Sequence, residues 1–170
     1  MKIEELLILV KPDGVKKFLT GNILTKLSES NMIIIGSKVV KVSEKLAQAH
    51  YYHLRDKPFF NELVDYIQGK VYGDSWNMVL AFVYQGDDAI SKMRRIVGAT
   101  NPEEAESVSI RGSYGRITTK GLYENVVHCS SNVSEAMREI KLWFKPEEII
   151  KNIYATKTII VDKEKKIIWA

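Results

Sequence analysis

The chain has 170 residues, of which 45% are hydrophobic and 27% are charged, and these ordinary values exclude a disordered chain, a collagen-like repeat and a disulfide scaffold. The length suits one compact domain with a single hydrophobic core. The formal net charge of +4 favours anionic partners such as nucleotides, nucleic acid or membrane surfaces, but a well-solvated basic surface accounts for it equally well.

The cysteine content and the apolar runs bear on where the protein works. Cys129 is the single cysteine, so an intrachain disulfide is impossible and nothing points to an oxidising compartment. No stretch approaches the roughly 18 consecutive apolar residues of a transmembrane helix. The N-terminus also lacks the long apolar region of a signal peptide. We therefore expect a soluble, cytoplasmic protein.

The first part of the chain predicts a strand, a helix and a second strand. Residues 6–10 form a continuous apolar run that stops at the turn-forming sequence KPDG (11–14), which is typical of a buried strand followed by a turn. Helical spacing of apolar residues predicts a helix over 20–30, with Thr20 as its N-cap. The isoleucine- and valine-rich segment 32–42 predicts the second strand.

Helical and extended patterns continue through the middle of the chain. Residues 43–54 and 58–67 have apolar side chains at helical spacing and predict a helical hairpin, with Pro58 in the first turn of its second helix. Residues 78–84 predict a strand, and 87–97 predict a helix. Each strand is thus followed by helical sequence.

The last third of the core combines a long loop, a short strand and a final helix. Residues 100–124 are expected to be mostly loop, and residues 126–128 a short strand. An amphipathic helix follows, which Asn132 and Glu135 can cap in a box-like arrangement. Residues 151–170 place apolar triplets on both sides of a charged run, a pattern that fits either a terminal hairpin or an arm on a neighbouring subunit.

The order of these elements predicts the fold class. Strand, helix, strand, helical hairpin, strand, helix, strand and helix match an α/β fold with a ferredoxin-like split βαβ core, a four-stranded antiparallel sheet and added helices. We expect this domain over residues 1–150 and a C-terminal extension over 151–170.

The usual nucleotide-binding motifs are missing, because neither GxxxxGK[ST] nor GxGxxG follows a predicted strand. The remaining candidates are the cations and glycines of KPDG (11–14), MRR (93–95) and IRGSYGR (110–116). Taken alone, each has a structural explanation: a lysine beside a turn, arginines that favour a helix C-terminus, and glycines that bend a loop.

His128 stands at the end of the short strand, directly before small polar residues. Side chains alternate along a strand, so His128 and Ser130 share a face while Cys129 points the other way. A catalytic pair of Cys129 and His128 is therefore not expected, and Cys129 is interpreted as a small buried residue.

Glu139 lies beside the apolar stripe of the following helix. If that helix packs over the strand, the carboxylate can accept a hydrogen bond from one ring nitrogen of His128 and leave the lone pair of the other free to attack. A solvent-facing Glu139 paired with Arg138 is an equally good interpretation of the sequence.

Six segments together resemble the nucleoside diphosphate kinase family. They follow one another between about residues 3 and 149 and read LLILVKPDGV, AHYYHLRDKPFFNELVDYI, MRRIVGATNP, SIRGSYG, NVVHCSS and EAMREIKLWFKPEEI. The resemblance implies a ping-pong transfer of the γ-phosphoryl group from a nucleoside triphosphate, typically ATP, to a nucleoside diphosphate. It also implies Mg²⁺ bound through the nucleotide phosphates, broad base specificity and a homo-oligomer, commonly a hexamer or tetramer.

The resemblance assigns roles to particular residues. It implies that His128 is the phosphorylated nucleophile, oriented by Glu139 and supported by Ser130 and Tyr51. It implies that the phosphates, the base and the sugar are held by Lys11, Phe59, Arg94, Thr100, Arg111 and Asn125. Phe59 would stack on the base, and Asn125 with Lys11 would contact the sugar. No metal ligand is expected from the chain itself.

Two departures from the family pattern stand out. The segment 115–124 is a few residues longer than usual, so the residue that closes over the base opposite Phe59 is left open. Ser131 replaces the usual acidic residue, which removes one carboxylate near His128.

A non-catalytic nucleic-acid-binding or regulatory module is the alternative that the basic charge suggests. The sequence lacks the aromatic-rich strand of RNA-recognition sheets, so we expect no specific nucleic acid as partner. We expect no membrane partner either, because no apolar stretch is long enough to span a bilayer.

Overall fold

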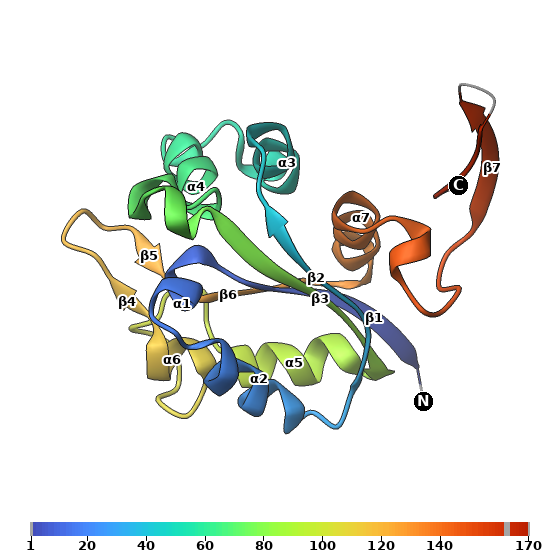
Figure 1. Ribbon diagram of the computed structural model, residues 1–170. Helices are drawn as coiled ribbons and strands as arrows, with labels where there is room; N and C mark the ends of the chain where they lie inside the picture. The colour runs from blue at the N-terminus through green and yellow to red at the C-terminus, as the bar shows by residue number, and fades with distance from the viewer. Residues whose placement is uncertain (1, 162–163, 170) are drawn as a thin grey trace.

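The computed structural model describes residues 2–161 and 164–169, and its core is a four-stranded antiparallel sheet (Figure 1). The strands lie in the order β2-β3-β1-β6, and every neighbouring pair is antiparallel. Their bounds are β1 (Ile3–Val10), β2 (Ile33–Lys41), β3 (Met78–Asp87) and β6 (Val127–Cys129). This arrangement confirms the predicted ferredoxin-like fold class.

Helices cover both faces of this sheet (Figure 1). One face carries α2 (Thr20–Ser28) and α5 (Ala89–Val97). The opposite face carries α3 (Glu44–His50), α4 (Phe60–Ile67) and α7 (Val133–Trp143).

The central strand β1 divides the core into two apolar clusters. Leu6, Ile8 and Val10 belong to the cluster under α2 and α5, whereas Leu7 and Leu9 belong to the cluster under α3, α4 and α7. Side chains alternate along a strand, so a strand that is covered on both faces needs apolar residues at every position. This explains the unbroken apolar run, and it makes β1 the rigid support on which β6 is paired.

Two predictions near the N-terminus are wrong. The KPDG segment is not a simple turn, because Pro12 begins the short helix α1 (Pro12–Lys16). Proline suits a first helical turn, where its missing N–H is not needed and its φ is already helical. Thr20 is not an N-cap either, since α2 starts at Thr20 itself and Leu19 occupies the cap position without a side-chain bond.

The segment predicted as mostly loop contains regular structure. It holds α6 (Ile110–Tyr114) and a small hairpin of β4 (Arg116–Ile117) and β5 (Tyr123–Glu124). Val126, expected within the strand, lies before it with a φ of 55°. Short 3-10 helices lie between these elements: η1 (Tyr52–Leu54), η2 (Lys70–Tyr72), η3 (Asp74–Trp76) and η4 (Pro146–Glu148).

The C-terminal segment forms an antiparallel hairpin of β7 (Thr156–Val161) and β8 (Glu164–Trp169) that stands apart from the sheet (Figure 1). The indole of Trp169 donates to the backbone oxygen of Phe144 at 2.7 Å and ties the hairpin to the end of α7. Farther out, Ile160 is 71% exposed. Among the described residues, no helix is long and apolar enough to cross a membrane.

Two glycines that connect α4 to β3 provide a matched test of packing. Gly69 and Gly73 both have positive φ, but a Cβ at Gly69 would lie 2.2 Å from the Trp76 carbonyl oxygen, whereas a Cβ at Gly73 would meet nothing within 4 Å. Gly73→Ala should therefore lower the free energy of unfolding by about 1–3 kcal/mol, the cost of a backbone conformation (φ 89°, ψ 165°) that is essentially restricted to glycine. Gly69→Ala should lower it by more than about 3 kcal/mol, since a backbone clash is added. Urea unfolding measures both, and equal effects would contradict the packing around Gly69.

Candidate active site

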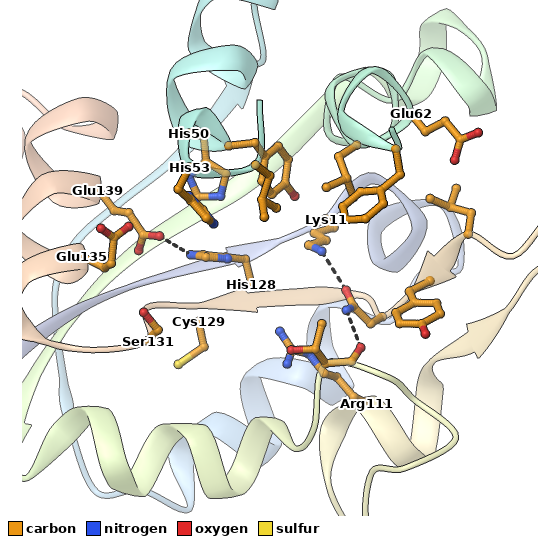
Figure 2. Close-up of a pocket in the computed structure, with 18 of the residues that line it drawn as sticks. Lys11, His50, His53, Glu62, Arg111, His128, Cys129, Ser131, Glu135 and Glu139 are labelled. Atoms are coloured by element: carbon orange, nitrogen blue, oxygen red, sulfur yellow. Dashed lines mark hydrogen bonds and ion pairs between the residues drawn. The ribbon is translucent and has the colours of Figure 1, made fainter. Parts of the chain in front are cut away.

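A cleft of about 880 Å³ lies beside the last strand of the sheet, between the helices of one face and the β4–β5 hairpin. Its size is that of a small-molecule site. Of the predicted site residues, all except Ser130 line it. They come from segments as far apart in the sequence as Lys11 and Glu139, and Figure 2 shows how the labelled side chains converge.

His128 and Glu139 form the central contact of the cleft (Figure 2). The Nε2 atom of His128 lies 2.9 Å from Oε1 of Glu139. The carboxylate oxygen does not lie in line with the ring N–H, so Nε2 has no well-aligned hydrogen-bond partner among the described residues. The other carboxylate oxygen, Oε2, accepts a hydrogen bond from the Ser130 hydroxyl at 2.6 Å. Ser130 therefore contacts the acid rather than the cleft.

Secondary structure explains why these two groups meet. His128 pairs with Leu9 of β1, which fixes its place in the sheet. Helix α7 begins where the Asn132 side chain accepts a hydrogen bond from the Glu135 N–H at 2.9 Å, the first half of the predicted capping box. The helix then packs Ile140 onto the sheet and brings its neighbour Glu139 to the strand.

Glu139 is a buried carboxylate, with 2% of its surface exposed. Burial by itself raises its pKa, but His128, the Ser130 hydroxyl and Arg138 lower it further than burial raises it, so the pKa lies below its usual value. Arg138 lies 3.9 Å from Glu139 and makes its closer ion pair, at 2.8 Å, with Glu135. The solvent-facing interpretation of Glu139 is therefore wrong.

His50 is a second histidine in the cleft that sequence reasoning missed. Its ring centre lies 4.5 Å from that of His128, and its Nδ1 accepts a hydrogen bond from the Trp143 indole at 3.1 Å. Burial, and then the nearby His128, lower the pKa of His50 well below its usual value, so the ring is neutral. Its position on a helix next to apolar residues looks like that of an ordinary core histidine, and no motif distinguishes it.

The site is a poor cage for a hard metal ion. His50, His128 and Glu139 each bring a potential ligand atom within 4.8 Å of the others, the one such group in the described part of the chain. The bond from Trp143 occupies the lone pair of His50 Nδ1, so the ring proton sits on Nε2 and leaves no second lone pair for a metal. Mg²⁺ also prefers oxygen ligands.

Positive side chains line the opposite part of the cleft. The ammonium group of Lys11 donates to Oδ1 of Asn125 at 2.7 Å, and Asn125 Nδ2 donates to the Thr100 carbonyl at 2.8 Å. The guanidinium of Arg111 donates to the Gly98 and Val127 carbonyls. Burial, followed by the charge of Arg111, lowers the pKa of Lys11 to about 7. Arg94 and Thr100 complete this side and are exposed.

Several lining groups have no partner or are open to a ligand. The hydroxyl of Tyr51 is buried without a hydrogen-bond partner among the described residues. Phe59 is 44% exposed and offers its ring to the cleft. Cys129 is buried, as predicted, and burial raises the pKa of its thiol to about 12, which disfavours the thiolate. The hairpin left unassigned from the sequence contributes Leu122 and Tyr123 to the lining.

This arrangement suits a reaction on an anionic group. An imidazole with one nitrogen held against a carboxylate keeps the other nitrogen available as a nucleophile. Cations fixed by carbonyl and amide oxygens can stabilise negative charge that develops on an incoming group. The half-exposed aromatic ring of Phe59 offers a stacking surface at the cleft.

Comparison with known proteins agrees with this chemistry. The family described as nucleoside diphosphate kinase matches residues 4–149. A nucleoside diphosphate kinase of Methanosphaera stadtmanae is 44% identical over 82% of this chain and 85% of its own, and one of Bacillus licheniformis is 40% identical over 88% and 94%.

Solved structures give the same answer. The halophilic nucleoside diphosphate kinase of Halobacterium salinarum in complex with CDP is 36% identical, with a TM-score of 0.78 over 88% of this chain and 93% of its own. A transition-state mimic of the Borrelia burgdorferi enzyme with bound vanadate and ADP is 31% identical, with a TM-score of 0.76 over 88% and 92%. By sequence and by fold, the chain belongs to the nucleoside diphosphate kinase family.

Proposed function

We propose that His128 is the nucleophile of this chain's reaction, the transfer of the γ-phosphoryl group from a nucleoside triphosphate to a nucleoside diphosphate. The observation that carries the proposal is the 2.9 Å contact between Nε2 of His128 and buried Glu139. The carboxylate favours the tautomer with its proton on Nε2, so the lone pair of Nδ1 is available to attack.

The transfer has two half-reactions. In the first, Nδ1 of His128 forms a bond to the γ-phosphorus while the bond from phosphorus to the bridging β-phosphate oxygen breaks, and the nucleoside diphosphate leaves. In the second, a terminal oxygen of an acceptor diphosphate attacks the phosphohistidine, and the N–P bond breaks to restore the imidazole. Glu139 stabilises the positive charge that the ring carries while it holds the phosphoryl group.

The cations of the cleft bind and stabilise the phosphates. Lys11, Arg94 and Arg111 surround the space in front of His128, and Thr100 and the Tyr51 hydroxyl add uncharged donors. Negative charge is spread over the equatorial oxygens during phosphoryl transfer, so each positioned donor can be worth about 3 kcal/mol in the transition state. Ser130 acts indirectly, by holding Glu139.

The nucleoside lies toward Phe59 and Asn125. An aromatic face reads no base edge, so stacking on Phe59 accepts any nucleobase and gives broad substrate range. Leu122 and Tyr123 lie on the hairpin that lines the same cleft. Asn125 and Lys11 contact the sugar. Mg²⁺ enters as part of the substrate, because the nitrogen-rich group near His128 does not fit it.

We further propose a homo-oligomer whose domain spans 1–150, with 151–170 as an interface arm. Edge strand β2 supports this, since Val39 is 63% exposed there, as does the exposed Ile160 on the terminal hairpin. A two-stranded hairpin is also only marginally stable by itself. The cytoplasmic location stays a prediction from the single cysteine.

Light scattering after size exclusion tests the assembly. The mass of the purified chain should be a multiple of 19.4 kDa, with hexamer and tetramer as the expected sizes. A truncated chain that ends at residue 150 should form smaller or less stable assemblies if the hairpin is an interface arm. A full-length protein that elutes as a monomer at micromolar concentration would contradict the proposal.

Labelling with γ-phosphate-labelled ATP tests the nucleophile. The chain should acquire an acid-labile phosphate that ADP or another diphosphate removes, and His128→Ala should not be labelled. Glu139→Gln should be labelled about 10-fold more slowly or worse, because an amide holds the tautomer less firmly. His53→Ala, which removes another histidine of the same cleft, is the matched control and should keep its label. Full labelling of His128→Ala would rule out the assignment.

The lowered pKa of Lys11 predicts how binding depends on pH. Below its pKa of about 7 the ammonium group is charged, and above it the group is neutral in the free protein. Bound phosphates favour the charged form, so the affinity for ADP should fall above pH 7 by up to about tenfold per pH unit. Calorimetric titration between pH 6.5 and 9 measures this. Lys11→Arg keeps its charge throughout this range, so its affinity for ADP should change little with pH. If its affinity falls as steeply as that of the unchanged chain, the pH dependence comes from another group.

A further inference from the structure

Val126 occupies a strained turn directly before the strand that carries His128. Its φ is 55°, a value that β-branched residues strongly disfavour, and its side chain is fully buried. Across it, the Val127 N–H donates to the Asn125 carbonyl at 2.6 Å. A three-residue turn with positive φ at its centre is rare and strained, so the surrounding structure must hold it in place.

Asp13 provides much of that restraint. One of its carboxylate oxygens accepts a hydrogen bond from the Val126 N–H at 3.0 Å, and the other accepts from the Tyr66 hydroxyl at 2.8 Å. The Val126 carbonyl accepts from the Lys11 N–H at 2.8 Å. Both polar groups of the strained residue are thus bonded to the segment after β1. Asp13 itself is fully buried, so its position is determined by these partners.

The residues on either side of the turn belong to the site. Asn125 bridges the Lys11 ammonium group and the Thr100 carbonyl through its side chain. On the other side, the Val127 carbonyl accepts two bonds from Arg111, and the next residue is His128. A relaxed φ at Val126 would rotate one side of the turn against the other, and Asn125 and His128 would no longer face the same ligand.

We propose that Asp13 is a positioning residue for the phosphoryl transfer, which it serves by holding Val126 in the left-handed turn that sets Asn125 and His128 relative to each other. This inference rests on the proposed role of His128. Asp13 does not line the cleft, so it acts through the backbone of Val126 and not by touching the nucleotide.

A different role for Asp13 must be separated from this one. Its negative charge also acts on the neighbouring Lys11 and favours the charged ammonium form. If that charge were its main contribution, any neutral residue at position 13 would be equally harmful. If the hydrogen bond to Val126 matters, a neutral acceptor of the same shape should suffice.

Substitutions at positions 13 and 126 make the test. The rate at which saturating labelled ATP phosphorylates His128 is measured in Asp13→Ala, Asp13→Asn, and the double variants Asp13→Ala/Val126→Gly and Asp13→Ala/Val126→Ala. Asp13→Ala should be slower by about 100-fold, the usual effect of a small misplacement of reacting groups. Asp13→Asn should be phosphorylated at nearly the rate of the unchanged chain. The side-chain oxygen of the asparagine can still accept a hydrogen bond from the Val126 N–H, and its amide group can donate one to the Tyr66 oxygen.

The double variants test the turn itself. Glycine adopts positive φ without strain, so Val126→Gly should recover much of the rate that Asp13→Ala loses. Val126→Ala removes nearly the same side chain but retains a Cβ, and it should not recover the rate. Thermal unfolding of each variant, measured alongside, identifies losses that come from instability. If Asp13→Ala does not fold, Tyr66→Phe serves instead, since it removes one of the two bonds that hold Asp13, and it should slow phosphorylation less but in the same direction.

The outcomes are distinct. A folded Asp13→Ala or, in its place, Tyr66→Phe with an unchanged rate overturns the inference, as does equal recovery by glycine and alanine at position 126. An Asp13→Asn variant as slow as Asp13→Ala assigns the effect to charge and overturns it too. If the unchanged chain carries no label on His128, the proposed function fails instead, whatever the variants do.

Discussion

The contact between His128 and Glu139 joins a strand to a helix, and the rest of the site is arranged around it. A buried carboxylate loses its hydration, and that cost is offset only by partners inside the protein. Glu139 has them in the imidazole at 2.9 Å and the Ser130 hydroxyl at 2.6 Å. Ser130 in turn accepts from the Leu7 N–H at 3.0 Å, so the acid is tied to the central strand. An imidazole supported in this way is held in position before a substrate arrives.

The positive groups of the cleft are held close together although they repel one another. Lys11 and Arg111 are both buried, and burial together with neighbouring cations lowers the pKa of each. Backbone carbonyls and the amide of Asn125 hold these side chains in place. An incoming polyphosphate relieves the repulsion, so part of the free energy of binding comes from groups that are less stable without it. The strained turn at Val126 is a second unfavourable feature of the site, and the Asp13 carboxylate that holds it lies beside Lys11.

Much of the fold follows from local pattern. The apolar run of β1 and the helical spacing of α5 and α7 are properties of neighbouring residues, so the order of strands and helices, and with it the fold class, could be predicted. The site residues were named by a different route, since their motifs match a family when taken together. Alternation along the strand placed His128 and Ser130 on one face, and in the structure both reach Glu139.

Other features depend on contacts between distant segments. Asp13 of the KPDG segment accepts a hydrogen bond from the distant Val126 N–H, and 115–124 forms a hairpin whose Leu122 and Tyr123 reach the cleft. The lowered pKa of His50 depends on its burial and then on His128, which is distant in the sequence. The sequence by itself determined the elements, the fold class and the nominated residues, because periodicity and motifs are local. Only the tertiary structure decided which nitrogen faces the acid, which cations converge and where the backbone is strained, because those depend on residues brought together by packing.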